Sequence, residues 1–259
     1  SAAIYGSRAA NGVIMITTKA GHARAEKVKV GFSMYGGWTQ VAKRMESLNF
    51  EQYREYLQDL GSNVVLPDGL TDQTNWFDET YHTGSTQNYQ LNVSGSTDKV
   101  NYFLSGGYTN EVGIVNTTKY SRYNFRTALD VDVTKWLNIG ANVAYAYSDN
   151  QGGISSGTGA NRGGLVLSVY NTPSYAPIYD PENPAHYYTN FYGVSNITHP
   201  LENIERYKNQ HTLQHRLLAS GKGIITLYDT KKFQRDDNFQ HSLKFTTTFT
   251  EDLRIINYT

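Results

Sequence analysis

The sequence predicts an all-β fold of antiparallel strands, and three observations support this prediction. Apolar and polar side chains alternate with a period of two in several segments, as strands with two different faces require. Tight turns and long polar connections follow these segments in alternation. The 259 residues include 23 Gly, 21 Tyr, 10 Phe and 3 Trp, a composition that suits strands with aromatic borders.

The expected strands are residues 27–38, 88–95, 100–108, 122–133, 137–147, 211–219 and 240–251. The clearest of them is 122–133, in which Tyr123, Phe125 and Leu129 share one face. The opposite face carries polar and charged residues, namely Arg122, Asn124, Arg126, Asp130 and Asp132. One exception is Phe103, which falls among polar and glycine positions. The strand register between residues 219 and 240 stays open, because the segment 231–238 is longer and more charged than a tight turn.

Three short helices are expected in the long connections. Asn49 offers a side-chain cap with Gln52 three residues later, and apolar residues then recur at helical spacing up to about residue 60. We expect this helix to pack at the end of the sheet. Residues 161–170 and 201–208 predict two further helices, the second one starting after Pro200.

The connections distinguish between two architectures. Tight turns at 95–98 and 133–136 alternate with long connections at 39–85, 110–120 and 149–210, so consecutive hairpins would place all long loops at one end. Strands of about ten residues with this arrangement are typical of an outer-membrane β-barrel. A secreted or surface β-sandwich that binds glycans or acts as an adhesin would show the same alternation, and it remains the alternative.

Composition excludes several classes of function. Lys+Arg and Asp+Glu both number 23, which argues against a nucleic-acid partner. The chain has no cysteine, and no window approaches 18 consecutive apolar residues, so neither a disulfide framework nor a transmembrane helix is expected.

The candidate catalytic and metal-binding residues are also weak. His211 and His215 would lie about 13 Å apart in a strand, too far for one zinc ion, and we expect them to face solvent or a lumen. Asp130 and Asp132 lie beside a tight turn, where lumenal charges are more common than catalytic ones. We therefore expect no catalytic residue, no metal site and no cofactor, and we do not expect an enzyme.

The N-terminal run resembles a known motif. It comprises Ile4, Tyr5, Gly6, Ser7, Arg8, Asn11 and Gly12, followed by residues 13–19. This run is similar to the closing motif of the plug domain in TonB-dependent outer-membrane transporters, most closely the SusC/RagA family of Bacteroidota. Residues 74–79, a Trp-acidic segment, and the strands up to about residue 150 resemble that family as well.

The resemblance implies a specific organisation. Residues 1–22 would be the C-terminal end of the plug domain, and 27–259 the N-terminal portion of a multi-pass transmembrane β-barrel with extracellular loops at 39–85, 110–120 and 149–210. The chain would thus be a fragment with about seven of roughly 22 barrel strands, preceded by the last plug strand. The TonB box and the signal peptide would lie outside it.

The resemblance also implies a function. It is active import of an oligosaccharide or peptide across the Gram-negative outer membrane, with a SusD-like surface lipoprotein as a lid and the TonB complex acting on a segment upstream. Arg122, Asn124, Arg126, Asp130 and Asp132 would face the lumen, where they either pair with the plug or line the solute path. The loop aromatics Tyr175, Tyr179, Tyr187, Tyr188 and Tyr192 either contact the substrate or lid, or pack the loops together.

Overall fold

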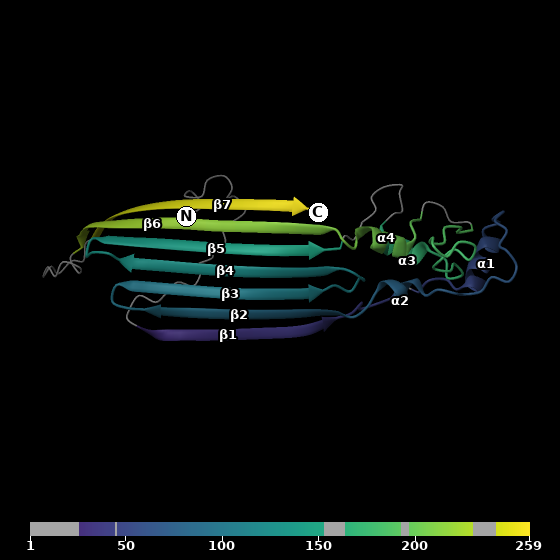
Figure 1. The fold of residues 1–259 in the computed structure, drawn as a ribbon, viewed down its shortest axis with the longest axis horizontal. Coiled ribbons are helices and arrows are strands. Elements are labelled where there is room, and N and C mark those ends of the chain that lie inside the picture. Colours follow the sequence, from purple (N-terminus) through teal and green to yellow (C-terminus); the bar gives the residue numbers. More distant parts are fainter. Residues whose placement is uncertain (1–25, 45, 153–163, 193–196, 230–241) are drawn as a thin grey trace.

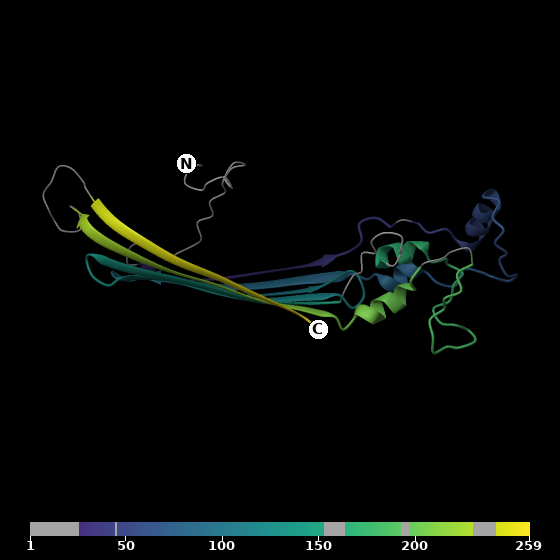
Figure 2. The ribbon, with the colours of Figure 1, turned by 90° about the horizontal axis from the view of Figure 1, so that it is seen from above.

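A computed structural model describes residues 26–44, 46–152, 164–192, 197–229 and 242–259. Its seven strands form one antiparallel sheet in sequence order, β1-β2-β3-β4-β5-β6-β7 (Figure 1). Their bounds are β1 Glu26–Thr39, β2 Gly84–Ser96, β3 Val100–Val112, β4 Lys119–Asp132, β5 Leu137–Gln151, β6 His211–Asp229 and β7 Ser242–Tyr258. Seen from its edge, the sheet is a single curved layer (Figure 2). The predicted all-β class of antiparallel strands is confirmed.

Both tight turns are stabilised by a threonine side chain that accepts hydrogen bonds from backbone N–H groups of the turn. In the turn between β2 and β3, the Thr97 hydroxyl accepts hydrogen bonds from the backbone N–H groups of Lys99 and Val100, at 3.4 and 3.1 Å. Between β4 and β5, the Thr134 hydroxyl accepts from Trp136 and Leu137, at 3.3 and 3.0 Å. A threonine side chain that replaces a backbone acceptor in this way favours a short turn.

The long connections lie together at the opposite end of the sheet, as the alternation of connections predicts (Figure 1). They contain four helices: α1 Phe50–Asp59, α2 Trp76–Thr80, α3 Leu165–Asn171 and α4 Pro200–Tyr207. The capping box of α1 is present, since Asn49 accepts from the Gln52 N–H while the Gln52 side chain accepts from the Asn49 N–H. Helix α2 was not expected, and it begins inside the Trp-acidic segment.

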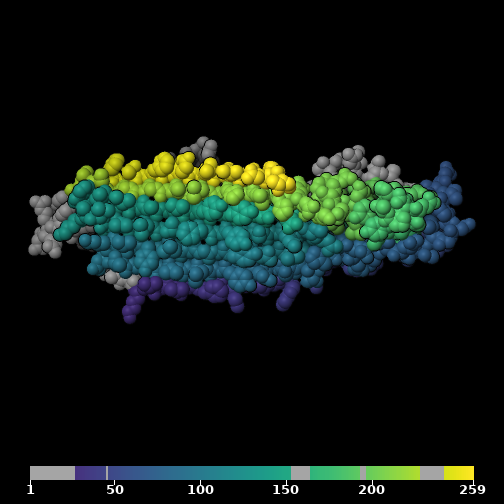
Figure 3. All heavy atoms as spheres, in the orientation of Figure 1, coloured from purple at the N-terminus to yellow at the C-terminus, as the bar shows by residue number. Residues whose placement is uncertain are grey.

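These connections build a common apolar core. The connection between β1 and β2 contributes Phe50 and Trp76 to this core, and the short connection between β3 and β4 contributes Val115. The connection between β5 and β6 contributes Leu165 and Tyr175. We call these connections, residues 40–83, 113–118 and 164–210 without residues 45 and 193–196, the loop layer. It continues the long axis of the sheet (Figure 3).

Two expectations need correction. The strands run further than predicted, because the Val112–Lys119 pairing shortens the connection expected at 110–120 to residues 113–118. The two-sheet sandwich is wrong for the described part of the chain, where all seven strands join in one sheet. No helix in the described ranges is long and apolar enough to cross a membrane.

Candidate functional site: the two faces of the sheet and the loop layer

One face of the sheet exposes large apolar side chains. Phe32 is 63% exposed, Phe125 48% and Phe249 68%, although all three belong to regular strands. Strand pairing places them on one face with Leu91, Leu104, Ile139 and Leu217. We call this the apolar face. Contiguous apolar surface of this extent is unfavourable in water and indicates contact with another apolar medium.

An aromatic row borders the apolar face on the side of the loop layer. Register places Tyr89, Tyr108, Tyr123, Tyr147 and His215 side by side on five successive strands. The ring centroids of Tyr108 and Tyr123 lie 4.8 Å apart, those of Tyr123 and Tyr147 6.3 Å, and those of Tyr147 and His215 4.9 Å. Amphipathic rings are favoured where hydrocarbon meets water.

The height of the apolar face matches a bilayer. From Tyr147 in the aromatic row to Leu137 at the far end, β5 covers about 33 Å at ~3.3 Å per residue. Barrel strands tilt by about 40°, which reduces this to ~25 Å along the membrane normal, the height of the apolar band of outer-membrane barrels.

The two strand histidines differ from the expectation. His215 lies in the aromatic row, and its Nδ1 is 2.8 Å from the Tyr145 hydroxyl oxygen. His211 has the same strand parity, and its Nδ1 is 2.9 Å from an Asp149 carboxylate oxygen. Both belong to the apolar-face side of β6, not to the polar side, because Tyr147 pairs with His215 and Gln151 with His211.

The opposite face, the polar face, carries a cross-strand ion pair. Lys222 Nζ on β6 lies 3.1 Å from Asp130 Oδ2 on β4, although β5 runs between these strands. The pair spans the intervening strand at Gly140, which is opposite both residues in register. A Cβ at Gly140 would lie 3.2 Å from Lys222 Cε and 3.4 Å from Asp130 Oδ2. The missing side chain therefore makes room for the ion pair.

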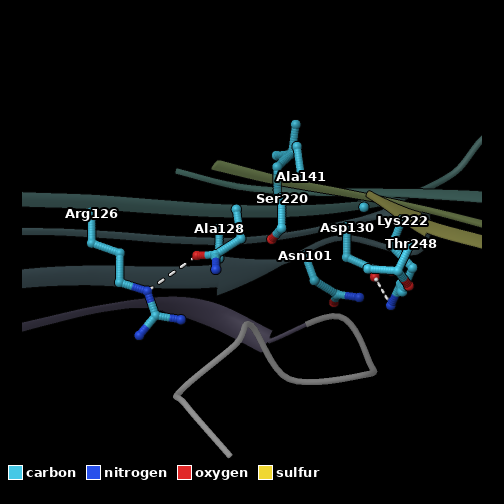
Figure 4. Close-up of a pocket in the computed structure, with 11 residues that line it drawn as sticks. Asn101, Arg126, Ala128, Asp130, Ala141, Ser220, Lys222 and Thr248 are labelled. Carbon is cyan, nitrogen blue, oxygen red and sulfur yellow. Dashed lines mark hydrogen bonds and ion pairs between the residues drawn. The ribbon is translucent and has the colours of Figure 1, made fainter. Parts of the chain in front are cut away.

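The same face contains a polar hollow of about 230 Å³. Arg126 Nε donates to Asn142 Oδ1 at 3.2 Å, and the Arg126 guanidinium lies 5.8 Å from the ring centroid of buried Phe103. Phe103, the exception in the alternation, thus packs beneath a charged neighbour. Figure 4 shows Arg126, Asp130, Lys222 and Asn101 on the same side of the sheet.

The structure places all five charged and polar candidates of β4 on this face. Arg126 and Asp130 line the hollow, and Asp132 accepts from Asn138 Nδ2 at 3.3 Å. Arg122 and Asn124 lie further along the strand towards the loop layer. Two lining residues, Ser220 and Lys222, were missed, because their position depends on the β6 register that the sequence left open. Asn142 on β5 was not recognised, because its contact with Arg126 depends on cross-strand pairing.

The first prediction concerns Gly140. In a double-mutant cycle, Asp130→Asn and Lys222→Gln should show a coupling of about 0.2–1 kcal/mol, since both groups are more than a third exposed. In a Gly140→Val background this coupling should vanish, because the branched side chain occupies the space between the charges. The measurement is urea unfolding of the receptor in lipid vesicles.

Gly221→Val is the matched control, since no atom lies within 4 Å of the position of its Cβ. Coupling that survives Gly140→Val would show that the charges do not meet across this glycine.

The five loop tyrosines differ in exposure. Tyr175 is fully buried, and its hydroxyl donates to the Tyr192 backbone oxygen at 3.1 Å. Burial raises the pKa of Tyr175 far above its usual value, with neighbouring Tyr53 adding to the effect. Tyr179 is 53% exposed, whereas Tyr187, Tyr188 and Tyr192 are partly buried. Contact of Tyr175 with a substrate would require the loop layer to open, and Tyr179 is the accessible ring.

A buried histidine links helices α2 and α4. His199 is the N-cap of α4, and its Nδ1 accepts from the Glu202 N–H at 3.4 Å. Its ring contacts Trp76 edge-on at 4.9 Å and stacks on Tyr187 at 4.7 Å. Burial lowers the pKa of His199 to about 4, although the Glu202 carboxylate and the Ile178 backbone act to raise it. The imidazole is therefore neutral at pH 7.

The second prediction follows from this pKa. Because the unfolded loops bind the His199 proton below a pKa of 6.5 and the folded loops only below about 4, the loop layer is most stable above pH 6.5. Its stability should fall by at most about 3 kcal/mol between pH 6.5 and 4, at ~1.4 kcal/mol per pH unit. Hydrogen exchange of α4 across this range measures the loss.

His199→Gln cannot titrate and should remove this part of the pH dependence. An unchanged pH profile in this variant would contradict the role of His199.

Two further site expectations concern the rest of the chain. The plug-end motif, Ile4 to Gly12, lies outside the described residues, as does the segment 231–238. Within the described residues, no group of three or more His, Asp or Glu side chains could hold a metal ion.

Comparisons with known proteins agree with this geometry. The chain is 36% identical over 167 residues to TonB-dependent receptor P3 of Formosa agariphila, covering 64% of the chain and 16% of the relative. It is 29% identical over 202 residues to TonB-dependent receptor SusC of Bacteroides thetaiotaomicron, covering 78% of the chain and 19% of the relative. The chain thus spans less than a fifth of the length of these relatives. No protein-family model matches it.

Solved structures show the same fold. The RagAB peptide importer in its open-open state superposes with a TM-score of 0.64 at 20% identity, covering 96% of this chain and 31% of that one. The closed-closed state gives a TM-score of 0.62 at 21% identity, with the same coverage.

An apolar face of bilayer height, an aromatic row and a polar opposite face define the wall of an outer-membrane β-barrel. The proteins it resembles in sequence are receptors of that membrane. The chain belongs to the SusC/RagA family of TonB-dependent receptors.

Proposed function

We propose that this chain forms part of the wall of a transporter that imports an oligosaccharide or peptide across the Gram-negative outer membrane, driven by the TonB complex. The observation that carries the proposal is the pair of unlike faces, apolar outside and charged inside, in a chain related to TonB-dependent receptors. The polar face, with Arg122, Asn124, Arg126, Asp130 and Asp132, then lines the lumen.

The proposal includes the domain organisation. Residues 1–22 form the end of a plug, and 27–259 form barrel wall with extracellular loops, an assignment supported by the sequence motif Ile4 to Gly12. The loop layer then faces outward, and a SusD-like lipoprotein docks above it. The RagAB structures, which share this fold, are described as a peptide importer, and this supports a peptide as cargo. The oligosaccharide is proposed from the sequence resemblance alone.

The direct test is energised uptake by cells that carry the complete receptor. Labelled oligosaccharide and peptide mixtures are supplied to wild-type cells, to a receptor deletion, to a TonB deletion and to the complemented strains. We expect both deletions to abolish uptake of the same fraction, and a protonophore to have the same effect. Uptake that persists without TonB would contradict active import.

The lipoprotein partner is tested separately. A tagged receptor, solubilised in mild detergent, should retain a SusD-like lipoprotein through affinity purification. Recovery of the receptor alone, from membranes in which the lipoprotein is abundant, would contradict the partnership without affecting the import proposal.

A further inference from the structure

Four arginines lie close together on the polar face, in the half of the sheet next to the loop layer. Strand pairing places them in three successive rows across the sheet, with Arg122 in the first row, Arg216 and Arg254 in the second, and Arg126 in the third. The structure describes every residue of these rows, and Asp252 carries their one carboxylate. Four arginines against one aspartate leave this part of the face with a surplus of positive charge.

Two of the arginines oppose each other directly. Arg216 and Arg254 pair in the register of β6 and β7, a position in which like charges are destabilising. The Nε and Nη2 atoms of Arg216 donate to the two carboxylate oxygens of Asp252 at 3.2 and 2.9 Å, and Arg254 Nη2 donates to Gln214 Oε1 at 3.2 Å. A single carboxylate therefore faces two guanidinium groups, and a neutral amide cannot supply the second negative charge.

Strand β5 presents short side chains between the arginines of β4 and those of β6 and β7. Ser148, Ala146 and Ala144 occupy its positions in the three rows, and all three are partly exposed. Neighbouring strands lie about 4.8 Å apart, so β4 and β6 are separated by ~10 Å, a gap that guanidinium groups from both sides can span towards a ligand above β5. Each guanidinium can bind a carboxylate through two parallel hydrogen bonds. The arrangement therefore suits a ligand with more than one carboxylate.

These arginines lie at the depth where the apolar face ends. Arg122 follows Tyr123 of the aromatic row by one position on β4, and Arg216 is next to His215 of the same row on β6, with their side chains on the opposite face. Both arginines are exposed, directly below the loop layer. In the proposed orientation this is the extracellular mouth of the lumen, which a solute from outside reaches before the rest of the polar face.

Neighbouring charges do not remove the surplus. The adjoining row towards the loop layer adds the carboxylate of Glu111, and the adjoining row on the other side adds the ammonium group of Lys29. The part of the proposed plug that belongs to this chain, residues 1–25, contains Arg8, Lys19 and Arg24 but neither Asp nor Glu. That segment would repel the arginines, which favours a negative partner from outside the chain.

We infer that Arg122, Arg126, Arg216 and Arg254 form a lumenal binding site for the carboxylate groups of an imported solute, so that the receptor takes up acidic oligomers in preference to neutral ones. Positive charge at the mouth of a channel also raises the local concentration of anions. The inference rests on the import function proposed above and adds a charge requirement to its cargo. Uronic acids and acidic peptides share this chemistry, and the test separates them.

The test uses the full-length receptor, purified from outer membranes in detergent, and isothermal titration calorimetry at low ionic strength. The probes are a galacturonic acid hexamer, a glutamate hexapeptide and a neutral glucose hexamer. We expect at least one acidic hexamer to bind more tightly than the neutral one, and its affinity to fall as salt is added. Arg122→Gln and Arg254→Gln should each weaken this binding about five-fold. The hexamer that binds identifies the source of the carboxylates.

A fourth variant changes the charge in the opposite direction. Asp252→Asn removes the one carboxylate of the three rows and should strengthen binding of the acidic hexamer by about two- to five-fold. A purely structural role of these residues would not give tighter binding. Arg54→Gln is the matched control, because it removes the same charge from α1 at the far end of the loop layer, where the Arg54 side chain is 53% exposed. Heat-modifiable gel mobility confirms that each variant is folded.

Three results would overturn the inference. They are equal affinity for the neutral and the acidic hexamers, no binding of either acidic hexamer, and binding that neither Arg122→Gln nor Arg254→Gln weakens more than Arg54→Gln does. Uptake measured in parallel separates the two proposals. TonB-dependent uptake of neutral solutes alone removes the carboxylate site and leaves active import in place, whereas uptake that does not need TonB removes active import.

Discussion

Replacing Trp76 with alanine should loosen the loop layer while leaving the barrel wall intact. Trp76 is 4% exposed, its Nε1–H donates to the Pro173 oxygen at 2.9 Å, and its ring contacts His199. The variant leaves a cavity between two connections that are far apart in sequence, and it removes one of the two hydrogen bonds that the Pro173 oxygen accepts, leaving the one from the Ala176 N–H at 3.2 Å. Removal of a buried tryptophan side chain costs about 3–5 kcal/mol.

The measurement is hydrogen exchange of the loop helices in the receptor in lipid vesicles. We expect amide protection in α2, α3 and α4 to fall by the equivalent of that energy, with protection in β3 to β5 unchanged. Trp38→Ala is the control, since Trp38 is 85% exposed at the end of β1. Loss of barrel protection together with loop protection would show that the loop layer is not a separate unit of stability.

Thr127→Lys should impair insertion of the barrel into membranes. Thr127 lies on the apolar face of β4, opposite Leu104 and Val143, near the middle of the apolar band. A lysine at the midplane of the lipid-facing side costs about 2–4 kcal/mol. We expect a lower yield of the heat-modifiable, folded form in vesicles and a lower unfolding midpoint in urea.

Thr250→Lys is the control on the polar face. Thr250 pairs with Ser220, and Asp252 lies two residues further along the same face of β7, so a lysine there meets water and a carboxylate. We expect this variant to fold as well as wild type. Equal damage from both substitutions would mean that the two faces do not contact different media, and the barrel assignment would fail.

Much of this fold could be predicted from local patterns. The alternation of Tyr123, Phe125 and Leu129 with charged residues identified both faces of β4, and the Asn49 capping box located α1. Such features depend on residues close in sequence, with periods of two or 3.6, and need no knowledge of the rest of the chain. Helix α2 was not predicted, because five residues are too few to show the 3.6-residue period of a helix.

The candidate site was less accessible to sequence reasoning. Lys222 joins Asp130 only because β6 pairs with β5 in one register, and a shift by one residue would send its side chain to the other face. The same register places His211 and His215 on the apolar-face side of β6, whereas the sequence analysis expected them to face solvent or a lumen. The loop tyrosines were recognised as a group, but composition could not separate buried Tyr175 from exposed Tyr179.

The sequence by itself determined which residues of each strand belong to the apolar face and which to the polar face, because this follows from the period of two. It also determined that the long connections lie at one end of the sheet, because this follows from the order of tight turns and long loops along the chain. Only the tertiary structure decided that Gly140 leaves room for an ion pair across a strand, and that Trp76, His199 and Tyr187 connect the loop core to its surface. Those contacts join residues far apart along the chain, so they exist only once strand register and loop packing bring them within a few ångströms of one another.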